Sequence, residues 1–388
     1  MSEWKEYKLG EIAEIIPGFA FKSKDFGPKG ELVVKIKDII PPYIDLSNSD
    51  HVDLTNYDMD KLKKYLLSDG DYAVAMTGAT IGKVGKMKTH QKAYLNQRVA
   101  KIKAKDGFCD GFVYYSISGD DFQTFIQNNI DSNSAQENIS ANSIARFPVM
   151  LPSLEIQHSI ASILTSLDDK IDLLRRENAT IEAMAETLFR QWFVEEAKEE
   201  DVALGDVVKT TSGGTPSRKH AEYYENGTIC WVKSKELDGS FISSTEELIT
   251  EDAVSNSSAK RLPEKSVLIA MYGATVGEYG ILSKSMTCNQ AVCALIPNEN
   301  YPFTYLFIWA AIMKQEFINL ATGAAQQNIS QDLIKQQFVS GDVGKIKEYD
   351  NRVRSLFDKM ENNQKQIQTL IQTRDELLPR LMGGEIKI

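Results

Sequence analysis

Two stretches of the chain place apolar residues at alternating steps of four and three, the spacing of a coiled-coil seam. Elsewhere the apolar residues come in short β-rich runs, such as residues 267–270. This contrast predicts mixed α/β domains joined to long polar helices. The first seam consists of Ile160, Leu164, Leu167, Ile171, Leu174, Asn178, Ile181, Ala185, Leu188 and Trp192. The second consists of Tyr349, Val353, Leu356, Met360, Asn363, Ile367, Leu370, Arg374, Leu377 and Leu381.

Each seam carries one asparagine near its middle, Asn178 and Asn363. A polar residue inside a seam can fix its register at some cost in stability. The alternative is that both asparagines lie just outside the seam and are solvated. A second alternative is that each helix packs on its own domain rather than on the other helix. Gly383 and Gly384 predict the end of the second helix.

The two domains are copies of each other. MTGATIGKVG at 76–85 returns as MYGATVGEYG at 271–280, and SAQENIS at 134–140 returns as AAQQNIS at 324–330. Similar pairs of segments recur in the same order along the chain, which indicates one duplication. In both copies a helical pattern follows the glycine loop, at 111–128 and 303–319. We therefore predict an α+β chain with two repeated α/β-mixed domains and two long helices in an antiparallel coiled coil, pseudo-twofold overall.

The length of the helices suggests a mechanism. About 34 helical residues at a rise of 1.5 Å span roughly 50 Å. An antiparallel pair would hold the two domains that far apart, which is about 15 base pairs of B-DNA. If the domains bind DNA, the arrangement predicts a bipartite target with an unread spacer.

The composition changes this picture little. The chain has 388 residues, 42% hydrophobic and 25% charged, with no apolar run long enough to span a membrane and no apolar leader. We expect a cytoplasmic protein. Four cysteines and four histidines are scattered without paired spacing, so no metal site is expected.

The net charge of −10 is concentrated at 151–200, which contains 11 acidic and 5 basic side chains. Basic patches elsewhere remain available for DNA.

The glycine loops do not match a phosphate-binding loop. Lys83 in the first copy is replaced by Glu278 in the second, and neither loop has the spacing of a P-loop or of Gly-x-Gly-x-x-Gly. The glycines instead suggest turns whose backbone can approach a partner closely.

Several segments together resemble the specificity subunits of type I restriction–modification systems. They are PGFAFKSKDFGPKGELVVKIKDI at 17–39, SGGTPSRKHAEYYENGTICWVKSKEL at 212–237, the two glycine loops, and AQENISANSIARFPVMLPSLEIQHSIASIL at 135–164. The resemblance covers essentially the whole chain. It divides the chain into target-recognition domain 1 (1–151), a central conserved helix (152–197), target-recognition domain 2 (198–340) and a C-terminal conserved helix (341–388).

The resemblance implies that each recognition domain reads one half of a split site in double-stranded DNA. It further implies that the helices set the spacer and dock two modification subunits, which methylate adenine with S-adenosylmethionine. Restriction subunits, dependent on ATP and magnesium, would join the same complex. The second junction departs from the pattern, because QFVSGDVGKIK at 337–347 replaces FPVMLPSLEIQ. The second junction therefore lacks the Leu-Pro and Glu-x-x-Gln features of the first.

We predict that this chain has no catalytic residues and holds no cofactor of its own. IPPY at 40–43 places Ile40 where an adenine methyltransferase needs an amide or carboxylate. An isoleucine cannot accept a hydrogen bond from the exocyclic amine of the base. The Pro-Pro pair more simply ends a strand.

DNA binding requires cations for phosphates and directional side chains for base edges. The candidates lie around the glycine loops, the Lys-x-Lys segments and the repeated amides. They are Lys22, Lys24, Lys35, Lys37, Thr77, Thr80, Lys83, Lys86, Gln136, Asn138, Arg218, Lys219, Lys233, Lys235, Tyr272, Thr275, Gln326 and Asn328. Any one lysine can instead be simply solvated, and the amides can cap a helix or hold the junction. The alternative functions are a two-domain coiled-coil scaffold without DNA specificity and the specificity part of another bipartite methyltransferase or nuclease.

Overall fold

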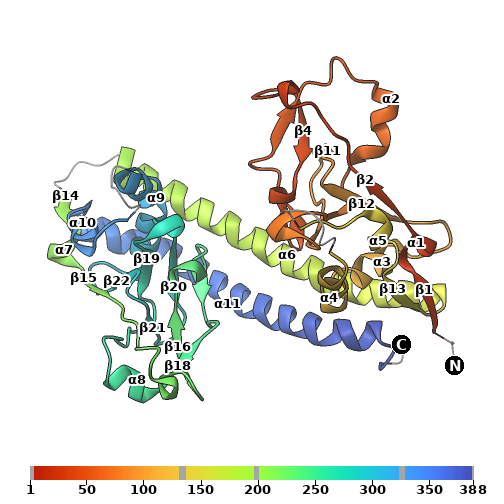
Figure 1. The fold of residues 1–388 in the computed structure, drawn as a ribbon. Coiled ribbons are helices and arrows are strands. Elements are labelled where there is room, and N and C mark those ends of the chain that lie inside the picture. The colour runs from red at the N-terminus through yellow and green to blue at the C-terminus, as the bar shows by residue number, and fades with distance from the viewer. Residues whose placement is uncertain (1–3, 131–136, 196–200, 323–327, 387–388) are drawn as a thin grey trace. The chain divides into compact units, whose positions relative to one another are not determined.

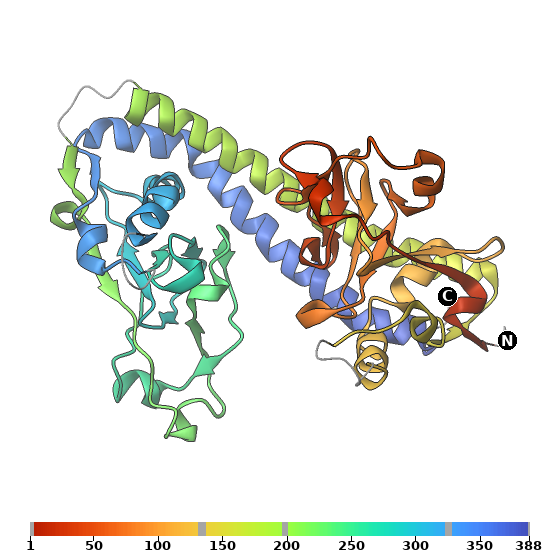
Figure 2. The same ribbon diagram turned by 45° about the horizontal axis from the view of Figure 1, so that its top comes forward.

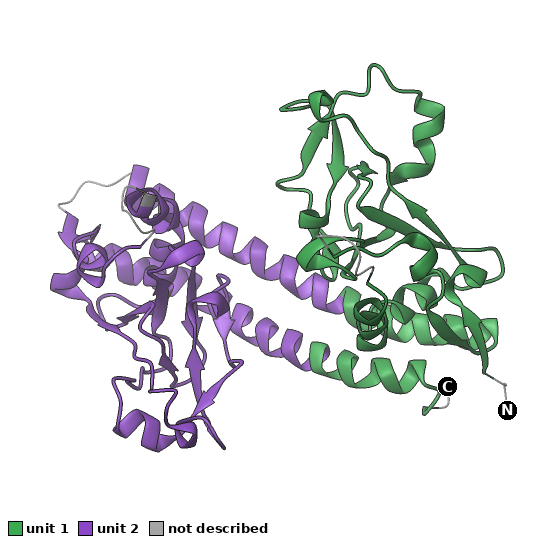
Figure 3. Ribbon diagram, viewed as in Figure 1, with its two compact units in different colours: residues 1–169, 371–388 green, residues 170–370 purple. Residues whose placement is uncertain are grey.

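The computed structural model describes residues 4–130, 137–195, 201–322 and 328–386 (Figure 1). The chain forms two compact units, shown in separate colours in Figure 3. Unit 1 comprises Met1–Asp169 and Ile371–Ile388, and unit 2 comprises Lys170–Leu370. Each unit holds one mixed domain and a part of both long helices. Across the described residues, the helices lack the combination of length and hydropathy that crossing a membrane requires.

The two long helices are α6 (Leu154–Arg190), which continues as a π-helical turn over Gln191–Glu195, and α11 (Val343–Met382). Their parts run antiparallel within each unit, side by side in both Figure 1 and Figure 2. In unit 2, Asn178 bonds to Asn363, and Tyr349 Oη donates to Ala185 O at 3.0 Å. The antiparallel helix pair predicted from the sequence is thereby confirmed. As predicted, α11 ends just before the glycine pair, and Gly384 adopts a φ of 71°.

The domain of unit 1 is built on two sheets and a short ribbon. The first sheet has the order β2 (Ala13–Pro17), β12 (Val99–Ala104), β9 (Tyr72–Ala75), β10 (Val84–Lys86), β6 (Tyr43–Ile44), β5 (Ile39–Ile40). The second has the order β3 (Phe26–Gly27), β7 (Asp50–Val52), β4 (Glu31–Val34), β11 (Ala93–Leu95), β8 (Leu66–Leu67). The ribbon pairs β1 (Lys5–Lys8) with β13 (Pro148–Leu151).

The domain of unit 2 repeats this plan with fewer strands. Its first sheet has the order β15 (Lys209–Ser212), β22 (Val292–Ile296), β19 (Val267–Ala270), β20 (Tyr279–Leu282), β17 (Phe241–Ile242). Its second has the order β18 (Leu248–Ile249), β16 (Ile229–Val232), β21 (Thr287–Cys288), and its ribbon pairs β14 (Asp201–Ala203) with β23 (Phe338–Ser340). The pair β4–β11 is parallel, and so is β16–β21. The duplication read from the sequence therefore extends to strand order and direction.

The helix after the glycine turn differs between the two domains. Unit 2 has one helix, α9 (Phe303–Thr322), whereas unit 1 has two, α3 (Asp110–Ser116) and α4 (Asp120–Asn128). The helical stretch predicted over 111–128 is thus divided between two helices in the structure. The break contains Ser118 and Gly119, and glycine costs helical backbone about 1 kcal/mol relative to alanine.

Short helices complete the domains, and two of them repeat the same cap. They are α1 (Leu9–Ile12), α2 (Met59–Leu62), α5 (Ala141–Ile144), α7 (Leu204–Val207), α8 (Glu251–Ser255) and α10 (Gln331–Lys335). Ser140 Oγ accepts from Ser143 N at the start of α5, and Ser330 Oγ accepts from Leu333 N at the start of α10. The serine of the repeated Asn-Ile-Ser motif is thus an N-cap in both domains.

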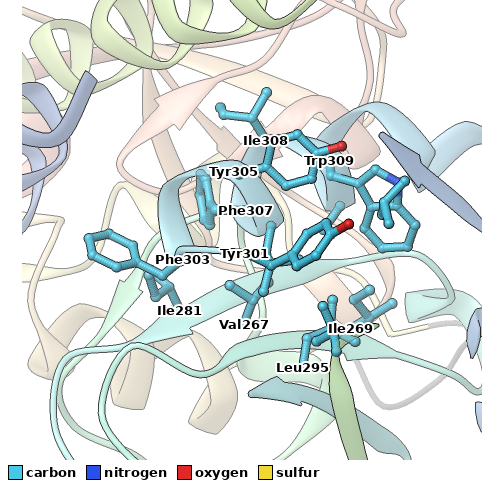
Figure 4. Packing of buried hydrophobic residues seen from close by; sticks show 14 of the residues in the cluster. Val267, Ile269, Ile281, Leu295, Tyr301, Phe303, Tyr305, Phe307, Ile308 and Trp309 are labelled. Atoms are coloured by element: carbon cyan, nitrogen blue, oxygen red, sulfur yellow. The ribbon is translucent and has the colours of Figure 1, made fainter. Parts of the chain in front are cut away.

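The largest core of unit 2 fills the space between α9 and its sheet (Figure 4). Val267, Ile269, Ile281 and Leu295 come from the strands, and aromatic residues such as Phe307 come from α9. The same core includes Ile181 and Ala185 of α6 and Val353 and Met360 of α11. In unit 1, Ile160, Leu164 and Leu381 join the domain core in the same way. The seam residues near the domains thus also bind the helices to those domains.

This docking shifts the seam away from the predicted heptads. Phe189 and Phe357 are buried, with 3% and 0% of their surface exposed, whereas the predicted Leu188 and Leu356 are half-buried beside them. The step of four, Ala185 to Phe189, follows the 3.6-residue period of a straight helix better than the heptad does. The helix ends here pack on a domain, so the heptad rule no longer selects the buried residue.

Candidate nucleic-acid interface

The Lys-x-Lys segments form the same 3₁₀ turn in both domains. The turns are Ile36–Asp38 after β4 and Ser234–Glu236 after β16. The backbone N–H of Lys35 donates to Asp38 Oδ2 at 2.7 Å, and that of Lys233 donates to Glu236 Oε2 at 2.7 Å. The acidic residue of the motif therefore closes the turn. Burial raises the pKa of the Asp38 carboxyl, against the effect of the Lys35 N–H bond.

A carboxylate from a neighbouring strand pairs with these lysines. Asp50 lies 2.7 Å from Lys35 Nζ and 3.5 Å from Lys37 Nζ. In unit 2, Glu247 lies 2.6 Å from Lys233 Nζ, and Glu246 lies 2.6 Å from Lys235 Nζ. The bond to Lys35 lowers the pKa of Asp50, and the bond to Lys233 lowers that of Glu247. The lysines are thus held in place and partly neutralised.

The glycine turn follows β9 in unit 1 and β19 in unit 2. Gly78 and Gly273, the first glycines, have φ values of 72° and 68°. Gly82 and Gly277, the last glycines, both have a φ of 82°. A Cβ on Gly273 would find open space, but one on Gly277 would lie 2.8 Å from Lys314 O of α9. The last glycine therefore serves packing, while the first leaves an open surface above the turn.

The repeated Asn-Ile-Ser segment lies beside the glycine turn. Asn138 forms an antiparallel bridge with Thr77, and Asn328 forms the same bridge with Tyr272. The next residue extends the contact, since Ile139 N donates to Met76 O at 2.9 Å. Ile329 N donates to Met271 O at the same distance. Two predicted motifs about 60 residues apart in sequence (77 and 138) thus meet in each domain.

A turn that begins with Asn-Gln completes the arrangement. It connects β11 of the second sheet to β12 of the first sheet in unit 1, and β21 to β22 in unit 2. Asn96 N donates to Val34 O at 3.0 Å, and Arg98 O accepts from Met76 N at 2.9 Å. In unit 2, Asn289 N donates to Val232 O at 2.9 Å, and Ala291 O accepts from Met271 N at 2.8 Å. This turn therefore links the Lys-x-Lys turn to the glycine turn.

We call these four segments the turn cluster. It consists of residues 35–38, 77–82, 96–98 and 137–139 in unit 1, and of 233–236, 272–277, 289–291 and 328–329 in unit 2. Thr80 Oγ1 donates to Ile36 O at 3.4 Å across the cluster of unit 1. The cluster combines cations, open glycine backbone and amide side chains, which can serve both phosphate contact and base reading. Among the described residues, the buried Thr77 Oγ1 has no hydrogen-bond partner.

The structure places several predicted residues in this cluster. Lys37, Lys235, Tyr272 and Asn328 are exposed, while Lys35, Thr77, Thr80, Asn138, Lys233 and Thr275 are half-buried. Thr275 Oγ1 donates to Tyr272 O at 3.0 Å, within the glycine turn itself. Arg218 joins the cluster of unit 2 through Glu247, which lies 2.6 Å from its Nη2. Gln136 and Gln326 lie outside the described residues.

Other predicted residues lie elsewhere. Lys83 lines a cavity of about 450 Å³ with Tyr115, Asp168 and Arg374, toward the helices of unit 1. Lys86 lies over the ring of Tyr114 on α3, 5.4 Å from its centroid. Lys22 precedes the 3₁₀ turn Ser23–Asp25 before β3, and Lys24 lies within that turn. Lys219 is exposed next to Arg218.

Sequence reasoning missed the carboxylates and part of the Asn-Gln turn. Asp50 lies in β7, and Glu246 and Glu247 directly precede β18, and no motif in the sequence indicates which strands these two pair with. Gln97 and Gln290 are exposed in the cluster, and Arg98 is exposed beside Gln97. The repetition of Asn-Gln in both halves is a sequence signal for Gln97 and Gln290. Arg98 has no such signal, because its counterpart in the second half is Ala291.

In the helices, the two predicted asparagines meet. Asn363 is 3% exposed, and its Nδ2 lies 2.9 Å from both Asn178 Oδ1 and Glu177 Oε2. Asn178 Nδ2 donates to Met360 O at 3.4 Å. In unit 1, Arg374 Nη1 bonds to Asp168 Oδ1 at 2.9 Å. The remaining predicted seam residues are buried or half-buried: Leu167, Ile171, Leu174, Trp192, Ile367, Leu370 and Leu377.

The described residues contain no group of three or more His, Cys, Asp or Glu side chains that could hold a metal ion. All four cysteines are buried and unpaired. Burial raises the pKa of the Cys288 thiol to about 12.

Comparison with known proteins gives a consistent result. The sequence matches the family described as "Type I restriction modification DNA specificity domain" over residues 1–183 and again over 197–340. The type I restriction enzyme MjaIX specificity subunit of Methanocaldococcus jannaschii is 26% identical over 317 residues, 76% of this chain and 73% of that protein. The EcoR124I/EcoR124II specificity subunit of Escherichia coli is 31% identical over 182 residues, 44% of each chain.

The fold is also found in a solved structure. The S subunit of a type I restriction–modification system from M. genitalium is similar with a TM-score of 0.60 at 14% identity. The match covers 98% of this chain and 96% of that one.

Proposed function

This chain belongs to the type I restriction–modification DNA specificity family, and from that premise we propose that each of its two domains reads one half of a bipartite site in double-stranded DNA. The observation that carries the proposal is the turn cluster, which recurs with the same backbone bonds in both units. Its common frame positions side chains that differ between the copies, such as the half-buried Thr77 and the exposed Tyr272. Two related domains with different exposed residues are suited to two different half-sites.

The helices would set the length of the unread spacer. They have 37 and 40 residues, and the bonded asparagine pair fixes their register in unit 2. We further propose that two modification subunits dock on them and that restriction subunits join the complex. In this scheme the chain supplies recognition, while S-adenosylmethionine, ATP and magnesium act in the partner subunits. The second helix is as long as the first, which supports docking on both.

Methylation mapping tests this function directly. The full chain is expressed with its modification subunits, and modified adenines are located across a genome. We expect one bipartite motif with a fixed spacer. A dispersed motif or a motif of one part would favour a scaffold without DNA specificity. DNA binding by the chain that does not weaken steeply as the salt concentration rises would favour the same alternative.

A matched variant tests the spacer. Removal of seven residues from each helix, 171–177 and 364–370, keeps the heptad phase and shortens the pair by about 10 Å. The preferred spacer should then shorten by about three base pairs. Removal of seven residues from α6 alone is the control, and it should disturb the helix pair without producing a new discrete spacer. An unchanged spacer in the paired deletion contradicts the role of the helices.

A further inference from the structure

The domain of unit 2 holds one arginine in a fixed orientation at its turn cluster. The Arg218 guanidinium lies 4.1 Å from the ring centroid of Tyr224 and 5.6 Å from that of Trp231. Its Nη2 donates to Glu247 Oε2 at 2.6 Å. The side chain nevertheless remains 58% exposed. Two rings and one carboxylate therefore orient the guanidinium, while its outer edge stays open to a ligand.

The groups that hold Arg218 are themselves fixed. Trp231 Nε1 donates to Gly214 O at 3.0 Å, and Tyr224 Oη donates to Pro216 O at 2.6 Å. The second oxygen of Glu247 accepts from Lys233 Nζ at 2.6 Å. Trp231 and Lys233 both belong to the segment that forms β16 and the Lys-x-Lys turn. The position of Arg218 is thus tied to the turn cluster.

The domain of unit 1 has the shared part of this arrangement without the arginine. Val33 and Trp231 are equivalent, because each stands two residues before the first lysine of its Lys-x-Lys turn. Asp50 pairs with Val33, and Glu247 O accepts from Trp231 N, so Asp50 is the counterpart of Glu247. Asp50 holds Lys35 and Lys37, and Lys35 lies over Phe26 at 4.1 Å. The carboxylate and the lysine are common to both copies. Arg218 with its two rings is particular to unit 2, as a residue that sets specificity should be.

We propose that Arg218 reads a guanine in the half-site of domain 2 and that Glu247, Tyr224 and Trp231 position it. This inference rests on the proposed function. Arginine has five N–H donors, and the bond to Glu247 uses one of them. The open donors can make the paired bonds to O6 and N7 that distinguish guanine in the major groove. An arginine already oriented by stacking loses less conformational freedom when it forms such a pair.

The local charge favours a base contact over a phosphate contact. Glu247 offsets one of the two positive charges of Arg218 and Lys233, and this weakens attraction to the DNA backbone. A carboxylate beside a phosphate anchor would reduce its affinity. Beside an arginine that reads a base, the carboxylate instead orients the guanidinium toward the base edge, because one charge-assisted bond fixes the guanidinium plane.

Three variants of the full chain, assembled with its modification subunits, test the inference. Arg218→Lys keeps the charge but loses the planar fork, and Glu247→Gln keeps an oxygen acceptor but loses the charge. Arg261→Lys is the matched control, because Arg261 forms an exposed pair with Glu251 in the same unit. Methylation rates are measured on DNA in which each base pair of both half-sites is changed in turn.

We expect Arg218→Lys to lower discrimination at a single G·C pair of the domain 2 half-site by about 5- to 140-fold. Glu247→Gln should lower it at the same pair by a smaller factor, and the double variant should add little to Arg218→Lys. Arg261→Lys and the domain 1 half-site should be unaffected.

Two outcomes overturn the inference. A loss of rate that is uniform over all positions identifies a phosphate contact, and an unchanged pattern in Arg218→Lys excludes any reading role. Both are distinct from failure of the proposed function, in which the wild-type complex itself yields no bipartite motif. Thermal unfolding of each variant separates loss of reading from loss of fold.

Discussion

At the scale of single residues, the glycines of the turn cluster divide into two kinds. Gly277 combines a positive φ with close contact to α9, whereas Gly273 has the positive φ alone. The difference predicts separate effects of the same substitution at two positions four residues apart.

We expect Gly277→Ala to lower the free energy of unfolding by about 2–5 kcal/mol, the sum of left-handed backbone strain and overpacking. Gly273→Ala should cost about 1–2 kcal/mol from strain alone but should weaken DNA binding, because its methyl group projects over the open turn. Denaturant unfolding and DNA titration of both variants check this. Equal losses of stability would contradict the division.

Glu182 of α6 offers a prediction that depends on pH. Burial raises the pKa of its carboxyl, although Tyr279 Oη donates to it at 2.6 Å. A carboxyl with a raised native pKa disfavours the native state wherever it is ionised, so this cost is present above the native pKa. The cost vanishes below the unfolded value of about 4.5, where both states are protonated.

Glu182→Gln keeps an oxygen for the tyrosine and removes the charge. We therefore expect it to unfold at a higher temperature than the wild type at pH 7. The gain should shrink as the pH falls toward 4.5. Glu348→Gln is the control, since Glu348 makes an exposed pair with Arg352 on α11. A gain that is constant over this pH range would show that the charge of Glu182 is not its cause.

At the scale of elements, the asparagine pair sets the helix register of unit 2. Asn363 is buried and gives its amide to Asn178 and Glu177, so a lone apolar replacement leaves both acceptors without that donor. Asn363→Leu should cost about 1–3 kcal/mol.

The double variant Asn178→Leu/Asn363→Leu should regain that loss or exceed wild-type stability, because it replaces a polar pair with apolar contact. Its helices should be less strictly in register, and its spacer preference should broaden. Denaturant unfolding gives the first result and methylation mapping the second. A double variant less stable than Asn363→Leu would exclude this role.

Much of the element plan could be predicted from the sequence because heptads and duplicated motifs are local signals. The period of 3.5 located both helices, and the glycine-loop and Asn-Ile-Ser repeats marked segments that meet in space. Phe189 and Phe357 could not be found that way, since burial there depends on a domain and not on the helix period. The partners Asp50 and Glu247 depend on strand register, which short strands of two or three residues do not specify.

At the scale of the whole molecule, the duplication predicts independent readers. Each unit has its own domain core and its own turn cluster. Replacement of residues 1–151 by the same region of a relative should therefore change one half of the methylated motif and leave the other half and the spacer intact. The reciprocal replacement of 198–340 is the matched control. A change in both halves from either exchange would contradict independent reading.

Unit 1 is assembled from two distant parts of the chain. Leu381 of α11 is 2% exposed within the core that α3 and β9 also build, and Gly384 lies against the ring of Trp4. A ribosome reaches residue 371 about 200 residues after residue 169, which takes about 10–40 s at ordinary rates of synthesis. Unit 2 is continuous and can fold first. A nascent chain therefore carries an unfinished, apolar N-terminal unit until α11 is made, so copies that stop early would be exposed to chaperones and proteases. Completion of synthesis itself thus becomes a condition for a functional reader.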